Sequence, residues 1–319
     1  MPTTISRVEV KPIASREKFV KFRGEMLDPK RSWTFVDENA IVKDAQTGKT
    51  IARLFKNYVK QDVIDEAYDN LLPLARKNVR NRGAAAGKIN RSESDNSTFR
   101  RTKRDGTISK FWESNPVKSS TLGYLENGYG TSFKYPEEGP IRLTRYAKKY
   151  PGRFESAYPL VRRLDSALKT ANRSVHAKLE RSRELIDGYT IGDSVFTSCA
   201  VNLDFRTAVH QDARNLGEWN CLTVLRRSDD RKHGGAARPE YLMLPRYRVA
   251  FNVSSGDVLA MHSSEWHCNS DFGVDARNRS PRLSVVGFFR EPLLRAAKDL
   301  VRSRGSSGTT AGSKRQTSE

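Results

Sequence analysis

The stretch FRTAVHQDARN, Phe205–Asn215, closes an apolar, β-branched run with a histidine and an aspartate two residues apart. Side chains at positions i and i+2 of a strand lie on the same face. A strand that continued here would therefore present the His210 imidazole and the Asp212 carboxylate together. The pair has two interpretations: an ordinary polar strand end, or two ligands of a metal site.

Short β-type runs continue from this stretch toward the C-terminus, separated by turn residues such as Gly234-Gly235 and Ser255-Gly256-Asp257. Many short strands at regular spacing predict a sandwich or a jelly roll. The runs are VFTSCAVNLDFRTAV, NCLTVLRR, EYLMLP, YRVAFNV, GDVLAMH and RLSVVGFFRE.

The sequence predicts one domain with two flanking segments. Residues 1–32 alternate weakly in polarity and predict an N-terminal arm, and residues 33–298 predict the domain itself. Residues 299–319 are rich in Ser, Gly and Thr and predict a disordered basic tail. Within the domain, AIVKDAQTGKTIARLF, Ala40–Phe55, predicts a hairpin that turns at Thr47-Gly48.

Two helical regions and one long loop are expected between this hairpin and the β-rich half. QDVIDEAYDNLLPLARK, Gln61–Lys77, has apolar residues at helical spacing and predicts a helix despite Pro73. The polar, Gly-rich and basic stretch Val79–Gly106 predicts a long loop that becomes ordered on binding. A second helical region is expected from about residue 153 to 185.

Positive charge is the strongest compositional signal. The 319-residue chain has 57 Lys and Arg against 37 Asp and Glu, for a formal net charge of +20. Basic residues concentrate in two stretches, Arg76–Lys110 and Arg142–Arg183. Such a surface favours a polyanionic partner, most simply nucleic acid, because Lys and Arg release the counterions that phosphates hold. A basic surface that serves only solubility is the alternative.

Other features of the composition indicate the cellular compartment in which the protein is expected. No apolar run is long enough to cross a membrane, and the N-terminal residues lack the apolar segment of a secretory signal. The three cysteines, Cys199, Cys221 and Cys268, form no CxxC pair and are odd in number. We therefore expect no disulfide partner and an intracellular, reducing compartment. The sequence does not predict an oligomeric state.

A metal site with two histidines and one carboxylate needs a second histidine from the β-rich region. Three are candidates. His233 lies in the turn-like loop RKHGGAARP, where a metal would be held poorly. His262 and His267 both follow the run SSGDVLA, a turn and a strand, and either one can complete the set.

The run PRLSVVGFFRE helps to decide whether His262 or His267 is the third ligand. Arg282 and Ser284 share one face of the predicted strand with apolar residues, so they can grip a carboxylate such as the distal one of 2-oxoglutarate. An arginine that points inward is costly without an anion. His267 precedes Arg282 by fifteen residues, whereas the same interval from His262 ends at Arg277, in a polar loop.

The register therefore favours His267 as the third ligand. His262 remains the runner-up ligand, or a group near the substrate. A core histidine beside Trp266 is the alternative interpretation of His267. If the three ligands hold Fe(II), three adjacent positions stay open for 2-oxoglutarate and O2, and the expected chemistry is hydroxylation of an unactivated C–H bond.

Several stretches together resemble the TET/JBP family of Fe(II) and 2-oxoglutarate dioxygenases, and most closely its bacteriophage and J-binding-protein branches. The similar stretches are FTSCAVNLDFRTAVHQDARN, GDVLAMHSSEWHCN, RLSVVGFF, NRGAAAG, SSTLGY and RLT. The resemblance covers roughly residues 35–292. It implies an α+β fold with a double-stranded β-helix, or jelly-roll, core at about residues 190–292, an N-terminal mixed α/β extension and supporting helices.

The resemblance also implies roles for individual residues. His210, Asp212 and His267 match the iron ligands, and Arg282, with Ser284, matches the 2-oxoglutarate site. Asn215 matches a position that contacts the target base, although an Asn that stabilises a turn is an equal alternative. Arg290 stands where related enzymes place a base-contacting histidine, so the identity of the base stays open. Residues expected near the base are Asn215, Arg290, His262 and Trp266.

The activity that the resemblance implies is oxidation of the 5-methyl group of a pyrimidine in DNA, with 5-methylcytosine favoured over thymine. Because a stacked base is inaccessible, the substrate would be a flipped or single-stranded methylated base. Trp219, Trp266 and Tyr124 are possible stacking partners, or else core aromatics. DNA-backbone contacts are expected from Arg80, Arg82, Arg100, Arg101, Lys103 and Arg104.

Two other functions remain open from the sequence. One is a hydroxylase with the same metal and co-substrate that acts on RNA or protein. The other is a non-catalytic, DNA-binding jelly roll with a decayed metal site. The compartment is a bacterial host cytoplasm if the chain comes from a bacteriophage, and a nucleus also fits.

Overall fold

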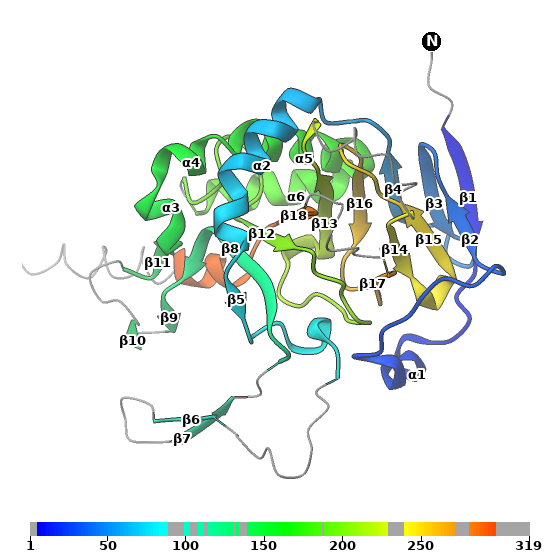
Figure 1. Cartoon of the computed structure of the whole chain (residues 1–319), viewed down its shortest axis with the longest axis horizontal. Helices are drawn as coiled ribbons and strands as arrows, with labels where there is room; N and C mark the ends of the chain where they lie inside the picture. The colour runs from blue at the N-terminus through cyan, green and yellow to red at the C-terminus, as the bar shows by residue number, and fades with distance from the viewer. Residues whose placement is uncertain are drawn as a thin grey trace, which may run out of the picture.

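A ten-stranded sheet runs through the computed structural model of the protein (Figure 1). The structure describes residues 5–88, 99–102, 108–111, 114–129, 132–133, 139–186, 188–228, 239–271 and 281–297. The sheet's strands are, in spatial order, β1 (Ser6–Val10), β3 (Ala40–Asp44), β4 (Thr50–Phe55), β16 (Val258–His262), β13 (Trp219–Leu225), β18 (Leu283–Phe288), β12 (Ser198–Leu203), β8 (Val117–Glu126) and β11 (Ile141–Leu143), and β5 (Asn78–Val79) pairs with β8.

A second sheet of four strands packs against part of the first. Its spatial order is β17 (Cys268–Asn269), β14 (Tyr241–Leu244), β15 (Val249–Asn252) and β2 (Thr34–Val36). Leu222 and Leu259 of the large sheet join Leu242 and Phe251 of the small sheet in one buried apolar cluster. The two sheets therefore enclose a core between them, as expected for strands with one buried face on each side.

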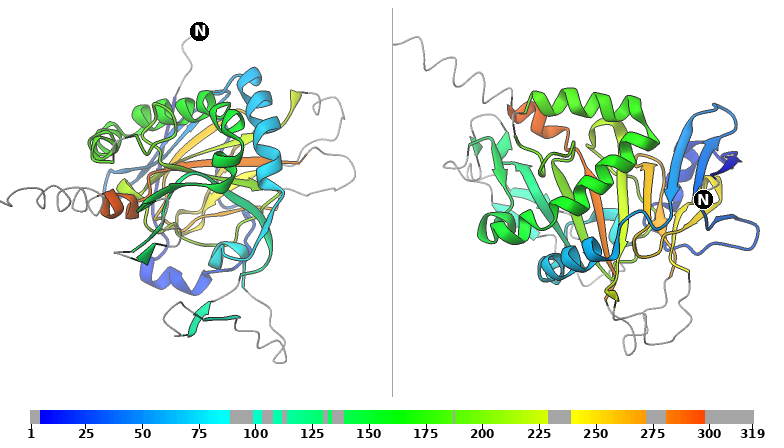
Figure 2. Two further views of the ribbon diagram at one scale, coloured as in Figure 1. Left: turned by 90° about the vertical axis from the view of Figure 1, so that its left-hand side faces the viewer. Right: turned by 90° about the horizontal axis from the view of Figure 1, so that it is seen from above.

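Five helices lie over the opposite face of the large sheet (Figure 2). Their apolar residues, such as Leu160 and Leu164, share a buried cluster with Leu283 and Val285 of β18. Side chains alternate along a strand, so Ser284 and Val286 of β18 face the other way, into a cavity between the sheets. The helices are α2 (Gln61–Ala75), α3 (Arg145–Lys149), α4 (Pro151–Glu155), α5 (Tyr158–Ala171) and α6 (Arg173–Glu184).

The predicted hairpin and helices are confirmed. Strands β3 and β4 pair antiparallel, and the Asp44 carboxylate accepts a hydrogen bond from the Gln46 amide in their turn. Helix α2 contains Pro73 in its last turn. The second helical region is broken between α5 and α6 at Asn172, whose side chain caps α6 by accepting from the Val175 amide at 3.1 Å.

The six C-terminal runs form strands, but the first is shorter than its apolar run predicts. Strand β12 ends at Leu203, and Asp204 has a φ of 45°. Because that left-handed conformation turns the chain out of the strand, the segment leading to His210 is irregular. His210 itself forms an isolated bridge with His267. The expected same-face arrangement within one strand is therefore wrong for His210 and Asp212.

Residues 5–32, expected as an arm, contribute to the body of the fold. Strand β1 pairs in parallel with β3, and Phe19 of helix α1 (Arg16–Phe19) packs against Trp266 with ring centroids 6.2 Å apart. These contacts bury Phe19, which a solvated arm would leave exposed.

The stretch Val79–Gly106, expected as one long loop, contains a short 3-10 helix at Gly83–Ala86 and strand β6 (Phe99–Thr102). Strand β6 pairs with β7 (Ile108–Phe111), and β9 (Gly128–Tyr129) pairs with β10 (Ser132–Phe133). Residues 89–98 and 103–106 of that loop and the predicted tail, residues 299–319, lie outside the described residues. Among the helices that the structure describes, none has the length and apolar character of a membrane span.

Candidate metal centre and adjoining cavity

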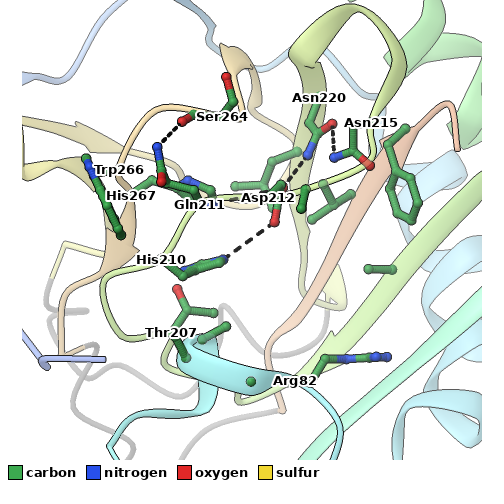
Figure 3. A pocket seen from close by; sticks show the side chains of 18 of the residues that line it. Arg82, Thr207, His210, Gln211, Asp212, Asn215, Asn220, Ser264, Trp266 and His267 are labelled. Carbon is green, nitrogen blue, oxygen red and sulfur yellow. Dashed lines mark hydrogen bonds and ion pairs between the residues drawn. The ribbon is translucent and has the colours of Figure 1, made fainter. Parts of the chain in front are cut away.

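His210, Asp212 and His267 lie together, with one potential ligand atom from each within 4.8 Å of the others (Figure 3). The distance from His210 Nε2 to Asp212 Oδ1 is 3.7 Å, and that from His267 Nε2 to Asp212 Oδ2 is 3.9 Å. The two histidines exchange backbone hydrogen bonds of 3.0 and 2.9 Å, which join segments distant in the chain. Two imidazoles and one carboxylate form a donor set that suits a ferrous ion.

Both imidazoles are fixed in the tautomer that a metal ligand needs. His210 Nδ1 donates to the Ala208 carbonyl at 2.8 Å, and His267 Nδ1 donates to the Glu265 carbonyl at 2.8 Å. A carbonyl only accepts, so each Nε2 keeps its lone pair for the centre of the cluster. Burial, followed by the nearby His267, lowers the pKa of His210 to about 4, which keeps this imidazole neutral at neutral pH. The donor set therefore fits a divalent metal.

Two asparagine side chains, linked in series by hydrogen bonds and called the amide chain below, orient Asp212, the third potential ligand. Asn220, at the start of β13, donates from Nδ2 to Asp212 Oδ2 at 2.5 Å, and Asn215 donates from Nδ2 to Asn220 Oδ1 at 3.1 Å. Asn220 is buried, whereas Asp212 is part-exposed toward the cavity. Because the carboxylate is held from one side, its orientation toward the two imidazoles is set before any metal binds.

A cavity of about 810 Å³ adjoins the cluster. Asp212 and both histidines line it, together with Asn215, Asn220, Arg82, Arg290, Ser284 and Trp266. Its volume falls within the range that proteins use for small ligands. The polar residues approach from several elements, and Figure 3 shows Arg82 below the cluster and Asn215 and Asn220 beside it.

Arg282 and Ser284, predicted to hold 2-oxoglutarate together, lie in different surroundings. Ser284 lines the cavity, but Arg282 is not among the cavity-lining residues. Arg282 is only 2% exposed, and its Nε donates to Glu240 Oε2 at 2.8 Å. A buried arginine needs an anionic partner, and Glu240 of the protein itself supplies that anion to Arg282.

Of the four residues expected near the base, three line the cavity and one does not. Asn215 and Arg290 form an isolated bridge and both line the cavity, with Arg290 in an ion pair with Glu126. Trp266 lines the cavity but is 4% exposed, and its Nε1 donates to the Arg16 carbonyl at 3.1 Å. His262 does not line this cavity; its Nε2 pairs with Glu218 at 3.2 Å.

Two of the proposed aromatic stacking partners lie away from the cavity. Neither Tyr124 nor Trp219 lines it. Tyr124 packs against Tyr189 with ring centroids 5.5 Å apart, and Trp219 belongs to the buried cluster beneath the helices. Their interpretation as core aromatics is the one that their contacts support.

The residues expected to contact the DNA backbone are only partly described. Arg80 is exposed, whereas Arg82 enters the cavity. Arg100 and Arg101 belong to strand β6, but their side chains lie outside the described residues, as do Lys103 and Arg104.

Two residues that orient the site were not predicted from the sequence. Asn220 is one, and Glu265 is the other. The Glu265 carboxylate is buried and receives Arg246 Nε at 2.9 Å and Nη2 at 2.6 Å, while its carbonyl holds His267. The sequence did contain a signal for Asn220. It is the one amide side chain in the otherwise largely apolar run WNCLTVL, and a buried polar side chain needs a hydrogen-bond partner.

The chain is similar to known proteins in sequence and in structure. The chain matches no protein-family model. It is 31% identical over 176 residues to the bifunctional helicase and thymine dioxygenase JBP2 of Trypanosoma brucei brucei, which covers 54% of this chain and 15% of that protein. It is 28% identical over 188 residues to JBP2 of Leishmania infantum, covering 59% and 16%.

A third relative is the thymine dioxygenase JBP1 of Trypanosoma brucei brucei, 27% identical over 184 residues, which cover 56% of this chain and 21% of that protein. The chain therefore spans about a fifth or less of the length of these relatives. Among solved structures, NgTET1 in complex with 5mC DNA aligns with a TM-score of 0.50 and 12% identity, over 92% of this chain and all of that chain. The chain is thus homologous to the JBP proteins over about half of its length and resembles NgTET1 in its fold.

Proposed function

We propose that the protein is an Fe(II)- and 2-oxoglutarate-dependent dioxygenase that hydroxylates the 5-methyl group of a pyrimidine base in DNA. The observation that carries the proposal is the cluster of His210, Asp212 and His267, with both Nδ1 atoms engaged by backbone carbonyls. Similarity to proteins named thymine dioxygenases, and to the fold of a protein solved with 5mC DNA, supports the same activity. The arrangement of two facing sheets supports the jelly-roll core expected from the sequence.

The three side chains would hold Fe(II) through the two Nε2 atoms and the Asp212 carboxylate. Bound iron would supply the oxidising chemistry, in which O2 and 2-oxoglutarate are consumed, succinate and CO2 are released, and a C–H bond is hydroxylated. The protein's own contribution is orientation. Asn220 fixes the Asp212 carboxylate, and the buried Arg246–Glu265 pair fixes the segment that carries His267.

The cavity is large enough for the co-substrate and a base together. Ser284 lines it, and the resemblance assigns the distal carboxylate of 2-oxoglutarate to Ser284 and Arg282. Trp266 and the apolar side chains of β18, such as Val286, would exclude water from the bound co-substrate.

The amide chain limits what Asn215 can offer to a base. The Asp212 carboxylate only accepts hydrogen bonds, so Asn220 donates to it and in turn accepts from Asn215. Asn215 therefore keeps its carbonyl oxygen and one N–H for another partner. A donor beside an acceptor matches N3 and the amino group of cytosine, and equally O4 and N3–H of thymine, so 5-methylcytosine and thymine are both proposed substrates.

The charge of the chain supports DNA as the substrate. Exposed basic residues such as Arg80 would contact backbone phosphates while the target base enters the cavity as a flipped or unpaired nucleotide. The relatives' names support DNA over the RNA or protein alternative. Residues 33–298 as one domain, an intracellular compartment and a bacteriophage origin stay predictions.

The test is a product assay. The protein is incubated with Fe(II), 2-oxoglutarate and duplexes that contain 5-methylcytosine or only thymine as the methylated base. The DNA is then digested to nucleosides for mass spectrometry. We expect a 5-hydroxymethyl nucleoside from at least one duplex, and none from an Asp212→Ala variant.

Single-stranded DNA of the same sequence and a matching RNA serve as substrate controls. Absence of 5-hydroxymethyl product from every DNA, with metal-dependent succinate release intact, would contradict the proposed substrate. Product from RNA alone would replace DNA by RNA as the substrate.

A further inference from the structure

Helices α3 to α6, which cover one face of the large sheet in Figure 2, carry exposed basic side chains on their outer surface. Their inner residues, among them Ala147, Phe154 and Leu164, belong to the buried cluster beneath the helices. The outer side chains include many lysines and arginines, and this set is called the helical basic surface below. Its members include Arg145, Lys149, Arg153, Arg163, Lys178 and Arg181, all of them exposed.

Helix α2 covers the same face of the sheet and carries the opposite charge. Its sequence, QDVIDEAYDNLLPLA, contains no lysine or arginine, and Asp62, Glu66 and Asp69 are exposed on it. A charge that serves only solubility needs no such separation of signs, because a mixture of both signs keeps a surface soluble. The separation therefore favours a polyanionic partner that contacts α3 to α6 and is repelled by α2.

The acidic residues of α3 to α6 leave the helical basic surface positive. Two of them flank the buried His176: Asp165 lies 3.1 Å from Nε2 and Glu180 lies 3.5 Å from Nδ1. The other two, Glu155 and Glu184, are exposed. Within the described part of the chain, none of the six basic residues named above forms an ion pair with a carboxylate. Their charges are therefore available to a partner.

An exposed tyrosine holds two of these cations close together. The Tyr150 side chain is 37% exposed, and its ring centroid lies 5.1 Å from Lys149 Nζ and 5.2 Å from Arg153 Cζ. Tyr146 supports this ring at a centroid distance of 5.1 Å and donates from its hydroxyl to the Asn70 carbonyl at 2.6 Å. Because the cation–π contacts already restrict both long side chains, less conformational entropy is lost when they bind phosphates.

The ten-stranded sheet separates the helical basic surface from the cavity. Leu283 and Val285 of β18 pack beneath the helices, whereas Ser284 and Val286 line the cavity on the other face. Figures 1 and 2 show helix α1, whose Arg16 also lines the cavity, on the far side of the sheet from α3 to α6. Phosphates bound on these helices would therefore belong to a different stretch of DNA from those beside a base inside the cavity.

We propose that the helical basic surface binds the phosphate backbone of DNA, at a site separate from the one that receives the target base. The choice of DNA as the polyanion rests on the proposed function. The site reads no sequence, because its cations match phosphates and not base edges. It would hold the protein on long DNA while the cavity takes up a base from another stretch.

An anionic membrane is the competing polyanion. Helices that bind a membrane surface present a broad apolar face beside their basic residues. Among the large apolar side chains that the described chain exposes, only Tyr150 and Leu185 lie in or directly after these helices. The helical basic surface therefore fits DNA better than lipid.

The experiment compares wild type with a surface variant that combines Lys149→Gln, Arg153→Gln and Arg181→Gln. The probe is a labelled duplex of guanine and cytosine alone, without any 5-methyl group, so that recognition of a methylated base makes no contribution. Fluorescence anisotropy gives the dissociation constant at several salt concentrations. Vesicles of neutral lipid with and without phosphatidylserine test the membrane alternative.

The matched control variant removes the same charge from the opposite edge of the sheet. It combines Arg7→Gln and Lys43→Gln, on strands β1 and β3, with Lys11→Gln, directly after β1. Thermal denaturation of all three proteins, and their binding of Ni(II), check that each variant is folded.

We expect the surface variant to bind the duplex about tenfold more weakly than wild type, because each phosphate contact contributes through counterion release. The slope of log affinity against log salt should also fall by about one for each phosphate contact removed. The control variant should stay within about twofold of wild type, since charges beyond a Debye length from the phosphates are screened. None of the proteins should bind the vesicles.

Equal weakening in the surface and control variants would overturn the inference, because it would show an effect of net charge without a site. Unchanged DNA binding by the surface variant would also overturn it, and selective loss of vesicle binding would make the surface a membrane contact. If wild type forms the hydroxymethyl product while the surface variant binds DNA as wild type does, only the inference fails. If wild type forms no such product, the proposed function fails, yet selective loss of duplex binding in the surface variant would still support the inference.

Discussion

Arg282 and Arg82 show two ways in which a protein accommodates a buried guanidinium. Arg282 is 2% exposed and donates to Glu240, so its charge is balanced within the fold. Arg82 lines the cavity beside the histidines, and within the described part of the chain its side chain donates hydrogen bonds to a hydroxyl and to an amide oxygen. The difference teaches that burial of an arginine indicates an anion, while the tertiary neighbours decide whether that anion is part of the protein or a ligand.

The largest expected effect comes from breaking the buried ion pair between Arg282 and Glu240. Arg282→Ala should lower the free energy of unfolding by about 3 kcal/mol, because it leaves the buried Glu240 carboxylate with fewer partners. Glu240 also pairs with Arg226, so we expect the low end of the range for buried pairs. Chemical denaturation followed by tryptophan fluorescence measures the loss.

A double variant separates the pair from the rest of the fold. Arg282→Ala with Glu240→Gln should be less destabilised than the sum of the two single variants, because the second change removes the uncompensated charge. Strict additivity of the two losses would show that the pair is not coupled, and Arg282 would again be available to a ligand.

Asp212 is another charged side chain whose neighbours decide its role, because Asn220 fixes the orientation of its carboxylate. Asn220→Ala removes the amide that orients the carboxylate and should weaken Ni(II) binding about tenfold, as loss of an orienting partner of a metal ligand does. Calorimetric titration with Ni(II) measures this directly. Asn215→Ala, one bond further along the amide chain, is the matched control and should change the metal affinity less.

The smallest expected effect concerns the stability of Arg82 variants. Arg82→Met should change the free energy of unfolding by less than about 1 kcal/mol, since none of the described carboxylates forms an ion pair with Arg82 and the change removes a partly buried charge. A large loss of stability without ligand would indicate an unnoticed anionic partner.

Local patterns in the sequence were sufficient for part of the fold. Alternation and turn residues predicted the strands of the C-terminal half, and helical spacing predicted α2. His210, Asp212 and His267 were singled out because residue type, spacing and resemblance agreed, and the structure brings their side chains together. The boundary at Leu203 was missed, because composition does not show that Asp204 leaves the extended conformation.

The partners of Arg282 and Arg82 could not be predicted in the same way. Glu240 lies 42 residues before Arg282 in the chain, and no local pattern links them. Arg82 stands in a basic stretch where charge alone favours a phosphate contact, yet the packing of β8 and β12 turns it into the cavity. Pairing across strands depends on tertiary register, which neither periodicity nor composition encodes.

The central claim is that His210, Asp212 and His267 bind iron together with 2-oxoglutarate. The most direct measurement is an anaerobic titration of the protein with Fe(II) and 2-oxoglutarate, followed by visible absorption, because chelation of Fe(II) by the keto acid gives a metal-to-ligand charge-transfer band. We predict that the band forms with one iron per wild-type chain and is absent from Asp212→Ala. A wild-type protein without the band, or a band that persists unchanged in Asp212→Ala, would contradict the account.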